Sequence, residues 1–590
     1  MKSFFKTVFA TMVGMLFFTI LAGFIGIMCI IGMVASSNAT KNVKDNSVFV
    51  LNLSGSLDER SESNFIDQFT GTVGNVIGLD DVLDAIKKAE ENDKIKGIYI
   101  EAGLFLPDSY ASLQAIRKAL TDFKKSGKWI IAYGDTYTQA TYYLASVADK
   151  VYLNPQGQID WGGVAMQAFY LKDFMAKFGV KMQLAKVGNY KSAPEMFTAD
   201  KMGELDREQR TAFVNGVWEN VCKDVSGSRK ISVDSLNAYA DKLITFDPAE
   251  NYKKYKMVDG LLYTDQVKKE VKKLLEIDED EDIRQLGVAD MMNVKSKKRK
   301  GEEIAVYYAY GDIVDGEGQS MLSNGHVIDA QVVCKDLERL MNDDDVKAVV
   351  IRVNSGGGSA YASEQIWHQV EMLKRTKPVV VSMGGMAASG GYYMSCIANW
   401  IVAEPTTLTG SIGIFGMFPD MSELLTDKLG VKFDEVKTNK HSTFGTRARP
   451  FNAEEMAYLE KYIDRGYKLF RSRVATGRKM SEDEVEKIAQ GHVWIGQDAL
   501  KIKLVDELGG LDVAVKKAAQ LAKLEEYYTY SYPSVKTWWE QLGAEVAGKN
   551  YLDERMKALM GEYYRPFMLL KTINQQNTIQ ARIPFAISIK

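Results

Sequence analysis

The sequence predicts an α/β protein made of two tandem repeats that follow an N-terminal transmembrane helix. Three observations lead to this fold class. An uncharged apolar stretch begins at Val8, one half of the chain resembles the other at an offset of 250 positions, and short apolar runs alternate with amphipathic helical patterns. The chain of 590 residues is also long enough for more than one globular unit, because domains average about 150 residues.

The N-terminal stretch is long enough to cross a bilayer as a helix. Val8–Val34 contains no charged residue over 27 positions, which corresponds to about 40 Å at ~1.5 Å per residue. We expect an uncleaved anchor, and the alternative is a long cleaved signal that ends near the small residues Ser37–Ala39. Because Lys2 and Lys6 precede the stretch, the positive-inside rule places the N-terminus in the cytoplasm and the body outside it.

Composition argues against several classes of protein. Hydrophobic residues make up 46% of the chain and charged residues 26%, as in globular domains and unlike disordered or polytopic membrane chains. The formal net charge of −3 gives no electrostatic basis for binding nucleic acid. The four cysteines and four histidines are scattered, so we expect no disulfide framework, no metal site and no cofactor.

The two halves of the body contain stretches that align without gaps. Gly134–Val164 aligns with Gly384–Ile414 at an offset of 250, and Lys177–Ser192 aligns with Lys428–Thr443 at an offset of 251. The basic run Lys295–Lys300 is typical of a linker, and a duplication of this kind predicts two similar structural units. The predicted domains are the cytoplasmic tip and anchor (1–36), a first repeat (37–295), a second repeat (303–545) and a C-terminal extension (546–590).

Each half alternates strand and helix patterns. In the second half, Ile304–Tyr308, Ala348–Val353 and Pro378–Met383 are apolar runs of strand length. Ala360–Arg375 and Phe451–Arg473 carry apolar residues at helical spacing. Strands that are linked by helices usually pair in parallel, so we expect each half to be an α/β unit with a mostly parallel, helix-covered sheet.

Two glycine-rich turns of the second half have the composition of a catalytic site. The predicted strand at 349–353 runs into Asn354–Ser359, and the next one runs into Gly384–Gly391, which contains Ser389. Small neighbours leave the Ser389 hydroxyl accessible, and the backbone N–H groups of Gly390 and Gly357 are suited to binding an oxyanion. Turns that follow neighbouring parallel strands open at the same edge of the sheet, which favours a nucleophilic serine there.

A serine nucleophile needs a base, and the sequence offers two candidates. His441 lies 52 positions after Ser389, among lysines and an asparagine that are typical of a surface loop. Lys191 follows an apolar strand and lies among small residues. A lysine serves as a base only when burial or a nearby cation lowers its pKa.

The duplication favours Lys191. Ser389 aligns with Gln139 in the first half, and Lys191 aligns with Ser442 in the second half. Gly356-Gly357 aligns with the stretch around Phe105-Leu106, which is not glycine-rich. Each half therefore lacks what the other has, as expected if one working site takes residues from both halves.

Five segments carry a resemblance to a known family. They read RVNSGGGS, GGMAASGGYYMS, TGSIGIFG, VGNYKSAPEMF and HVWIGQDAL, at Arg352–Ser359, Gly384–Ser395, Thr409–Gly416, Val187–Phe197 and His492–Leu500. The sequence resembles the long, duplicated type of the signal peptide peptidase A family, whose members are membrane-anchored Ser-Lys serine peptidases with the fold of the Clp protease and crotonase superfamily. The resemblance covers nearly the whole chain.

The resemblance implies a role for each candidate residue. Ser389 is implied to be the nucleophile, Lys191 the general base, Ser411 the residue that orients the lysine, and Gly357 and Gly390 the oxyanion hole. It also implies cleavage of apolar signal peptides left in the membrane, a homotetramer, and a single-pass protein of the bacterial inner membrane with its body on the periplasmic side. The family's usual Ser-Pro-Gly-Gly turn is Ser-Gly-Gly-Gly at 355–358, so the rigidifying proline is missing.

Two other function classes stay open at this stage. An acyl-CoA hydratase or isomerase on the same fold would use the paired N–H groups to bind a thioester oxyanion. The predicted position of the body outside the cytoplasm argues against this class, because acyl-CoA is cytosolic. A non-catalytic membrane scaffold is the other alternative. The presence of Ser389, Lys191, Ser411 and both glycine-rich turns argues against it.

Overall fold

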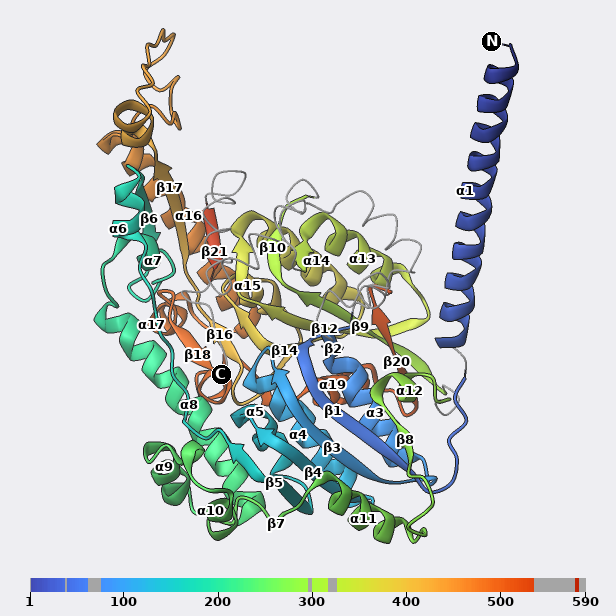
Figure 1. The fold of residues 1–590 in the computed structure, drawn as a ribbon. Helices are drawn as coiled ribbons and strands as arrows, with labels where there is room; N and C mark the ends of the chain where they lie inside the picture. The colour runs from blue at the N-terminus through green and yellow to red at the C-terminus, as the bar shows by residue number, and fades with distance from the viewer. Residues whose placement is uncertain are drawn as a thin grey trace.

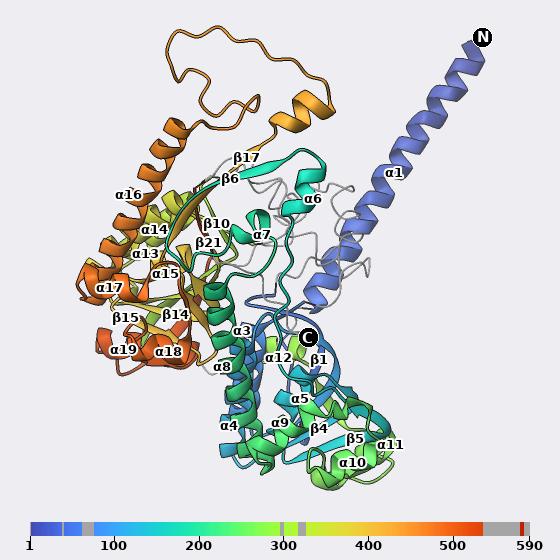
Figure 2. The same cartoon turned by 90° about the vertical axis from the view of Figure 1, so that its left-hand side faces the viewer.

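The apolar N-terminal stretch forms one long helix that stands apart from the body. In the computed structural model, which describes residues 2–37, 40–61, 76–295, 300–316, 326–534 and 579–582, this helix is α1 (Lys2–Ser37). Both views show it beside the body rather than packed into it (Figures 1 and 2). Its segment Lys6–Gly26 has a mean hydropathy of 2.3 and buries none of its most apolar window. The predicted membrane helix is therefore present as a candidate span.

The first repeat contains a parallel sheet in the order β2-β1-β3-β4-β5-β7, with β8 also paired to β1. Its central strands contain runs of consecutive buried residues, such as Ile130–Gly134, so both faces of the sheet are covered there. The strands are β1 (Ser47–Asp58), β2 (Val76–Gly78), β3 (Ile95–Leu106), β4 (Trp129–Tyr137), β5 (Lys150–Ile159), β7 (Gly260–Leu261) and β8 (Arg284–Leu286). The helices of this repeat are α3 (Leu79–Glu91), α4 (Tyr110–Lys125), α5 (Gln139–Ala145), α8 (Glu204–Arg229), α9 (Val233–Asp241), α10 (Ala249–Lys254), α11 (Thr264–Leu275) and α12 (Val288–Met292).

The second repeat contains the corresponding sheet in the order β18-β16-β14-β12-β9-β20; in addition, β15 pairs with β14, and β19 pairs with β15. Its strands are β9 (Glu302–Tyr310), β12 (Val346–Ser355), β14 (Val379–Ala388), β15 (Trp400–Ala403), β16 (Leu408–Gly410), β18 (Val493–Ile495), β19 (Glu507–Leu508) and β20 (Tyr527–Tyr532). Its helices are α13 (Ala330–Asn342), α14 (Ala360–Thr376), α15 (Gly390–Ser395), α16 (Ala453–Arg478), α17 (Glu482–Ile488), α18 (Gly496–Lys501) and α19 (Leu511–Ala522).

A third sheet joins the two repeats. Its order is β11-β10-β13-β21-β17-β6, and its strands are β6 (Lys181–Val187), β10 (Asp312–Val314), β11 (Val327–Asp329), β13 (Gly357–Ser359), β17 (Ile414–Asp420) and β21 (Ile579–Arg582). β6 comes from the first half and pairs antiparallel with β17 over seven residues. The halves are therefore not fully separate α/β units, because this ladder crosses the expected boundary between them.

The strands β6 and β17 lead away from the body into a projecting arm (Figures 1 and 2). The arm comprises α6 (Lys172–Lys177), the outer ends of the two strands, and residues 421–451 before α16. Several of its large apolar side chains are exposed, namely Phe174, Phe178, Leu429, Val431, Phe433, Val436 and Phe444. An apolar surface of this kind is typical of a site where another surface packs.

The expected elements of the second half are found close to their predicted bounds. The helix predicted at 451–473 is α16, and its N-cap Asn452 forms a capping box with Glu455. One prediction was wrong: Gly384–Ala388 was placed in a turn, but it continues strand β14, and Ala387 pairs with Ser355 after a bulge. The alignment of 177–192 with 428–443 also fails structurally, because only the first-half segment has a partner strand. Most of the predicted linker (296–299) and of the C-terminal extension lies outside the described residues.

Candidate active site

Ser389 lies at a sharp turn between a strand and a helix. It follows the last residue of β14 and caps α15, with φ 54° and ψ −113°, a conformation that is costly for a residue with a side chain. Its N–H donates to the carbonyl oxygen of Gly410 at 2.8 Å, and the residue is fully buried. Two positions after Ser389 only glycine fits, because a Cβ on Gly391 would lie 2.7 Å from the carbonyl oxygen of Ser355.

Lys191 reaches Ser389 from the loop that follows β6. Its Nζ lies 2.7 Å from Ser389 Oγ, and it donates to Ser411 Oγ at 2.9 Å and to the Ser411 carbonyl oxygen at 3.1 Å. Lys191 of the first half and Ser389 of the second half are thus in contact within one chain, although 198 positions separate them in sequence. Ser411 is also held at a positive φ of 52°, which aims both of its oxygens at the lysine amine.

Burial determines the charge of the Lys191 amine. The side chain is fully buried, and its stem runs along backbone, since a Cβ on Gly413 would lie 3.3 Å from Lys191 Cδ and one on Gly491 would lie 2.7 Å from Lys191 Cβ. Removal from water lowers the pKa of Lys191 well below its ordinary value of 10.5. A neutral amine beside a serine hydroxyl is able to accept the proton of that hydroxyl.

A polar network on α8 fixes the lysine loop. The Gln209 amide donates to the Tyr190 carbonyl oxygen and to Ser192 Oγ, each at 3.1 Å, and accepts from the N–H of Val493 at 3.1 Å. Ser192 also donates to the Asp206 carboxylate at 2.5 Å. Sequence reasoning did not identify Gln209 or Asp206, because polar residues on a helix give no local sign of what they contact.

The two predicted oxyanion donors lie next to each other. Gly390 is the first residue of α15, so its N–H has no partner within the helix, and a Cβ on it would lie 3.1 Å from the Gly357 Cα. Gly357 has φ 99°, which favours glycine. In this structure the Gly357 N–H donates to Ser355 Oγ at 3.1 Å, and Ser355 Oγ in turn donates to the Gly311 carbonyl oxygen at 2.7 Å.

A strand from the C-terminal region fills the space between β13 and β17. β21 pairs antiparallel with both of them, with Ala581 opposite Gly358 and Gln580 opposite Phe415. Ala581 is fully buried, and a Cβ on Gly357 would lie 1.9 Å from its carbonyl oxygen. The site therefore has room for one extended peptide that bonds through its backbone on both sides.

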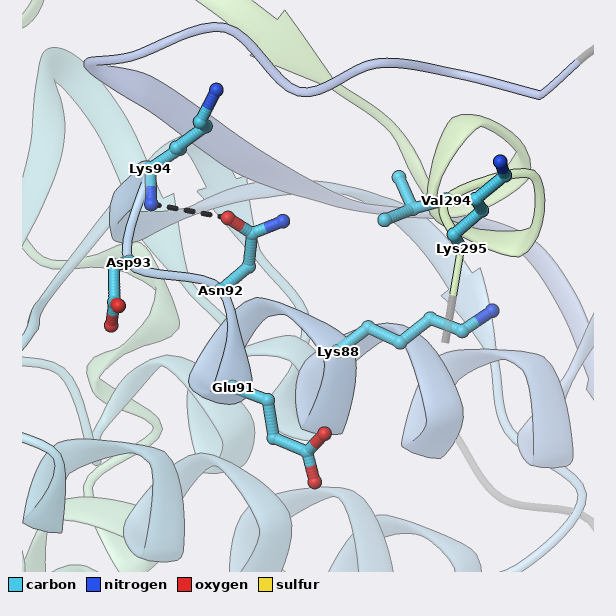
Figure 3. Close-up of a pocket in the computed structure, with 7 residues that line it drawn as sticks. All are labelled: Lys88, Glu91, Asn92, Asp93, Lys94, Val294 and Lys295. Carbon is cyan, nitrogen blue, oxygen red and sulfur yellow. Dashed lines mark hydrogen bonds between the residues drawn. The ribbon is translucent and has the colours of Figure 1, made fainter. Parts of the chain in front are cut away.

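The other candidates lie elsewhere. The His441 ring is on the projecting arm, 3.7 Å from Glu454 and 3.9 Å from Glu455, so it is not grouped with Ser389. Gln139 is buried in the first repeat, where its amide donates to the Tyr110 hydroxyl at 2.7 Å. A hollow beside the C-terminal end of α3 shares no residue with the site; it is lined by Lys88, Glu91, Asn92, Asp93, Lys94, Val294 and Lys295 (Figure 3).

Comparison with known families identifies this arrangement. The model of peptidase family S49 matches residues 122–278 and 371–525, one segment in each repeat, and the Clp protease model matches residues 309–400. The chain belongs to peptidase family S49. The twofold match confirms the predicted tandem repeats and their Clp-protease-like fold, and this S49 chain is a serine peptidase.

Curated relatives of this S49 peptidase support the same conclusion. Protease 4 of Salmonella typhi is 38% identical over 512 residues, which is 85% of this chain and 80% of that protein. Protease 4 of Haemophilus influenzae is 35% identical over 521 residues, covering 84% and 82% of the two chains. The chloroplastic serine protease SPPA of Arabidopsis thaliana is 29% identical over 490 residues, covering 82% and 70%. An acyl-CoA hydratase or a scaffold is not favoured by these similarities.

Proposed function

We propose that this S49 peptidase hydrolyses signal peptides in the membrane with Ser389 as nucleophile and Lys191 as general base. The observation that carries the proposal is the 2.7 Å hydrogen bond between Ser389 Oγ and the amine of a fully buried lysine. A lysine in this position needs no histidine, metal or cofactor to activate the serine.

The proposed reaction follows from the contacts of these groups. Lys191 takes the Ser389 proton as Oγ attacks the scissile carbonyl carbon, and it returns that proton to the amine that leaves. Water then hydrolyses the acyl-enzyme with Lys191 again as base. Ser411 keeps the amine directed at Ser389 through its two bonds to Nζ.

The oxyanion that forms in each step would be bound by the N–H groups of Gly390 and Gly357. The Gly357 N–H donates to Ser355 Oγ in this structure, so it has to exchange that partner for the oxyanion. Position 356 is glycine instead of the family's usual proline, and the less rigid turn that results is suited to this exchange of partners.

Substrates of this site are proposed to be extended apolar peptides. The place of β21 between β13 and β17 supports a binding mode in which such a peptide pairs with both edges as an added strand. The candidate span in α1 would hold the enzyme in the same bilayer as its substrates, which raises their effective concentration. We place the N-terminus in the cytoplasm and the body on the periplasmic side of the bacterial inner membrane, as the lysines before the span indicate.

We also propose that the enzyme is a homotetramer in which the projecting arm packs against a neighbouring subunit. The exposed apolar side chains of the arm support this arrangement, since a subunit contact would cover them. Light scattering of the detergent-solubilised chain tests the proposal. A monomer at micromolar concentration would contradict it.

Active-site labelling tests the proposed chemistry. A fluorophosphonate probe should modify Ser389 in the wild-type protein, as read by peptide mass spectrometry. It should fail to modify the Lys191→Ala variant, and His441→Ala should react like the wild type because that ring lies on the arm. Labelling of another serine, or equal labelling of the Lys191→Ala variant, would contradict the proposal.

A further inference from the structure

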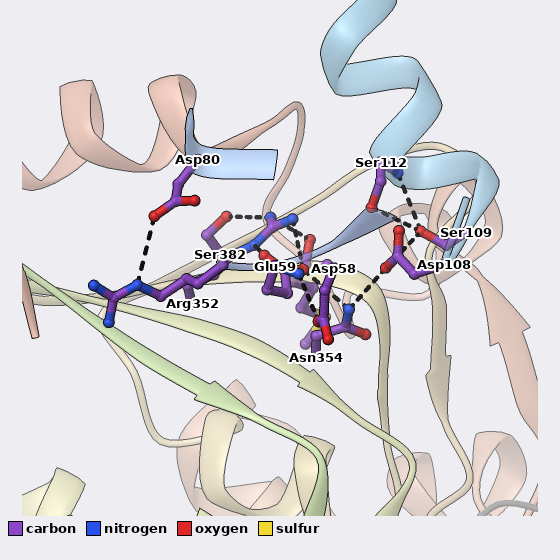
Figure 4. Close-up of polar contacts among 12 residues, drawn as sticks. Asp58, Glu59, Asp80, Asp108, Ser109, Ser112, Arg352, Asn354 and Ser382 are labelled. Carbon is purple, nitrogen blue, oxygen red and sulfur yellow. Dashed lines mark hydrogen bonds and ion pairs between the residues drawn. The ribbon is translucent and has the colours of Figure 1, made fainter. Parts of the chain in front are cut away.

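A cluster of buried and half-buried polar side chains joins the two repeats behind the second glycine-rich turn. It contains Glu59 and Asp108 from the first repeat and Arg352, Asn354 and Ser382 from the second, and we call it the seam cluster (Figure 4). Glu59 and Arg352 are 2% and 3% exposed. Arg352 donates to the two Glu59 carboxylate oxygens at 2.9 and 3.1 Å and to Ser382 Oγ at 3.0 Å. The cluster therefore holds the strand ends of one repeat against those of the other.

Asn354 connects this cluster to the proposed oxyanion turn. Its Nδ2 donates to Glu59 Oε1 and to Asp108 Oδ2, each at 3.0 Å, and its Oδ1 accepts from the N–H of Met386 at 3.1 Å. Asn354 directly precedes Ser355, whose Oγ holds the Gly357 N–H. One side chain thus fixes the end of β12 to β14, three residues before Ser389, and to the first repeat.

The first-repeat side of the contact is the counterpart of the oxyanion turn itself. At the offset of 250, Ser109 aligns with Ser359, and each of the two caps the helix that follows it. The same offset places Asp108 opposite Gly358. The first-repeat turn that corresponds to the oxyanion turn therefore carries a carboxylate, Asp108. This carboxylate contacts Asn354, which directly precedes the oxyanion turn of the second repeat.

The glycines at 384 and 385 are explained by the same contact. A Cβ on Gly384 would lie 2.4 Å from Glu59 Oε1, and one on Gly385 would lie 2.4 Å from the Ser109 Cβ. These glycines lie within β14 rather than at the nucleophile. Their absence of side chains lets the first-repeat turn approach the strand that carries Ser389.

We infer that the first-repeat turn at 106–109 positions the oxyanion turn of the second repeat, through Asp108 and its hydrogen bond to Asn354. The inference rests on the proposed function of Ser389, Gly357 and Gly390. The half-buried Asn354 amide bonds to two carboxylates and to a backbone N–H, so it has few other orientations available and fixes the backbone on either side of it. Asp108, Asn354 and Glu59 are positioning residues, since they act through the turn and not on the substrate.

The charges of the cluster indicate which substitution should preserve the contact. Arg352 neutralises Glu59, whereas burial and the Glu59 carboxylate raise the pKa of Asp108 to about 7. Asp108 Oδ1 is buried without a hydrogen-bond partner among the described residues, while Oδ2 accepts from Asn354. The contact needs an acceptor oxygen at this place rather than a charge, and Asp108→Asn retains one.

The test compares acylation and turnover in full-length, detergent-solubilised variants. Asp108→Ala and Asn354→Ala should lower kcat and the rate of fluorophosphonate labelling of Ser389 by about tenfold or more, less than the ~100–1000-fold for loss of an oxyanion donor itself. KM for a peptide substrate should change by less than about twofold, because the strand edges that bind substrate remain. Asp108→Asn should recover most of the lost rate.

A matched control separates positioning from stability. Gln114 on α4 accepts from the Thr406 hydroxyl at 2.7 Å, another contact between the repeats, which does not involve the oxyanion turn. Gln114→Ala should keep the wild-type kcat, whatever its effect on the melting temperature. If Asp108→Ala does not fold, Asn354→Ala tests the same bond from the other side.

Two results would overturn this inference without affecting the proposed function. One is labelling of Ser389 that is as fast in Asp108→Ala as in the wild type. The other is a fall in rate in Gln114→Ala and Asp108→Asn that equals the fall in Asp108→Ala. Absence of Ser389 labelling in the wild type would instead overturn the proposed function, and the inference with it.

Discussion

Replacing Lys191 by methionine should make the stability of the protein less dependent on pH. Methionine has a similar unbranched stem and no ionisable group, so it fits the same buried channel between Gly413 and Gly491. Ser389→Ala is the background for both proteins, because it prevents self-digestion during unfolding. The difference between the lysine and methionine forms then reports on the protonation of one amine.

The magnitude follows from linkage between protonation and folding. Burial lowers the pKa of Lys191 well below 10.5, so over a range of pH the unfolded chain binds a proton that the folded chain does not. In that range the free energy of unfolding of the lysine form rises by about 1.4 kcal/mol per pH unit relative to the methionine form. Two pH units within that range correspond to a relative gain of about 2.7 kcal/mol, and the gain ends where the unfolded lysine also loses its proton.

Urea unfolding of the two solubilised proteins, followed by tryptophan fluorescence at pH 7, 8 and 9, measures this difference. All other titrating groups are common to both forms, so their contributions cancel in the comparison. Parallel stability curves with no change in the difference across this range would show that Lys191 keeps its proton in the folded state. Such a result would refute both the argument from burial and the role of Lys191 as a base.

Four other predictions concern activity. Because only a neutral lysine acts as a base, kcat/KM should rise with pH through the lowered pKa of Lys191, and a flat profile from pH 5 to 9 would contradict this. Lys191→Ala should lower kcat by about 100–10,000-fold while His441→Ala stays within about twofold, as measured with a fluorogenic peptide. Truncation before Ile579 should lower KM, since β21 no longer competes for the space between β13 and β17; an unchanged KM would show that β21 does not compete. A mixture of Ser389→Ala and Lys191→Ala subunits should remain inactive, because the two residues meet within one chain, and recovered activity would show sharing between subunits.

Comparison of the two halves predicted the repeats, and local patterns predicted most elements of the second half, although not the continuation of β14 to Ala388. Strand and helix periodicity is set by neighbouring residues, and the predicted helix at 360–375 ends one residue later in the structure, at Thr376. The comparison of the two halves also favoured Lys191 over His441, although the alignment of 177–192 with 428–443 that contributed to this prediction is not reproduced in the structure. A missing residue in one repeat is informative only when the other repeat shows what belongs there.

The contacts between the repeats could not be predicted in the same way. β21 has four residues and pairs with strands more than 150 positions away, so nothing near it in sequence marks it as part of a sheet. The seam cluster consists of polar residues that look like ordinary loop and strand-end residues. The offset of 250 that places Asp108 opposite Gly358 was the one available signal, and it becomes meaningful only once Asn354 is seen beside Asp108.

The first repeat is better described as rebuilt than as decayed. At the place of the nucleophile, Gln139 uses both ends of its amide: it donates to Tyr110 and to the carbonyl oxygen of Gly163, and it accepts from the N–H groups of Gly162 and Gly163. A serine there would leave the buried Tyr110 hydroxyl without this partner, and an unpaired buried polar group costs about 1–3 kcal/mol. The first repeat therefore has its own polar contacts at the position that corresponds to Ser389, while Gln209 and Asp206 on α8 hold the loop that carries Lys191 beside the second repeat.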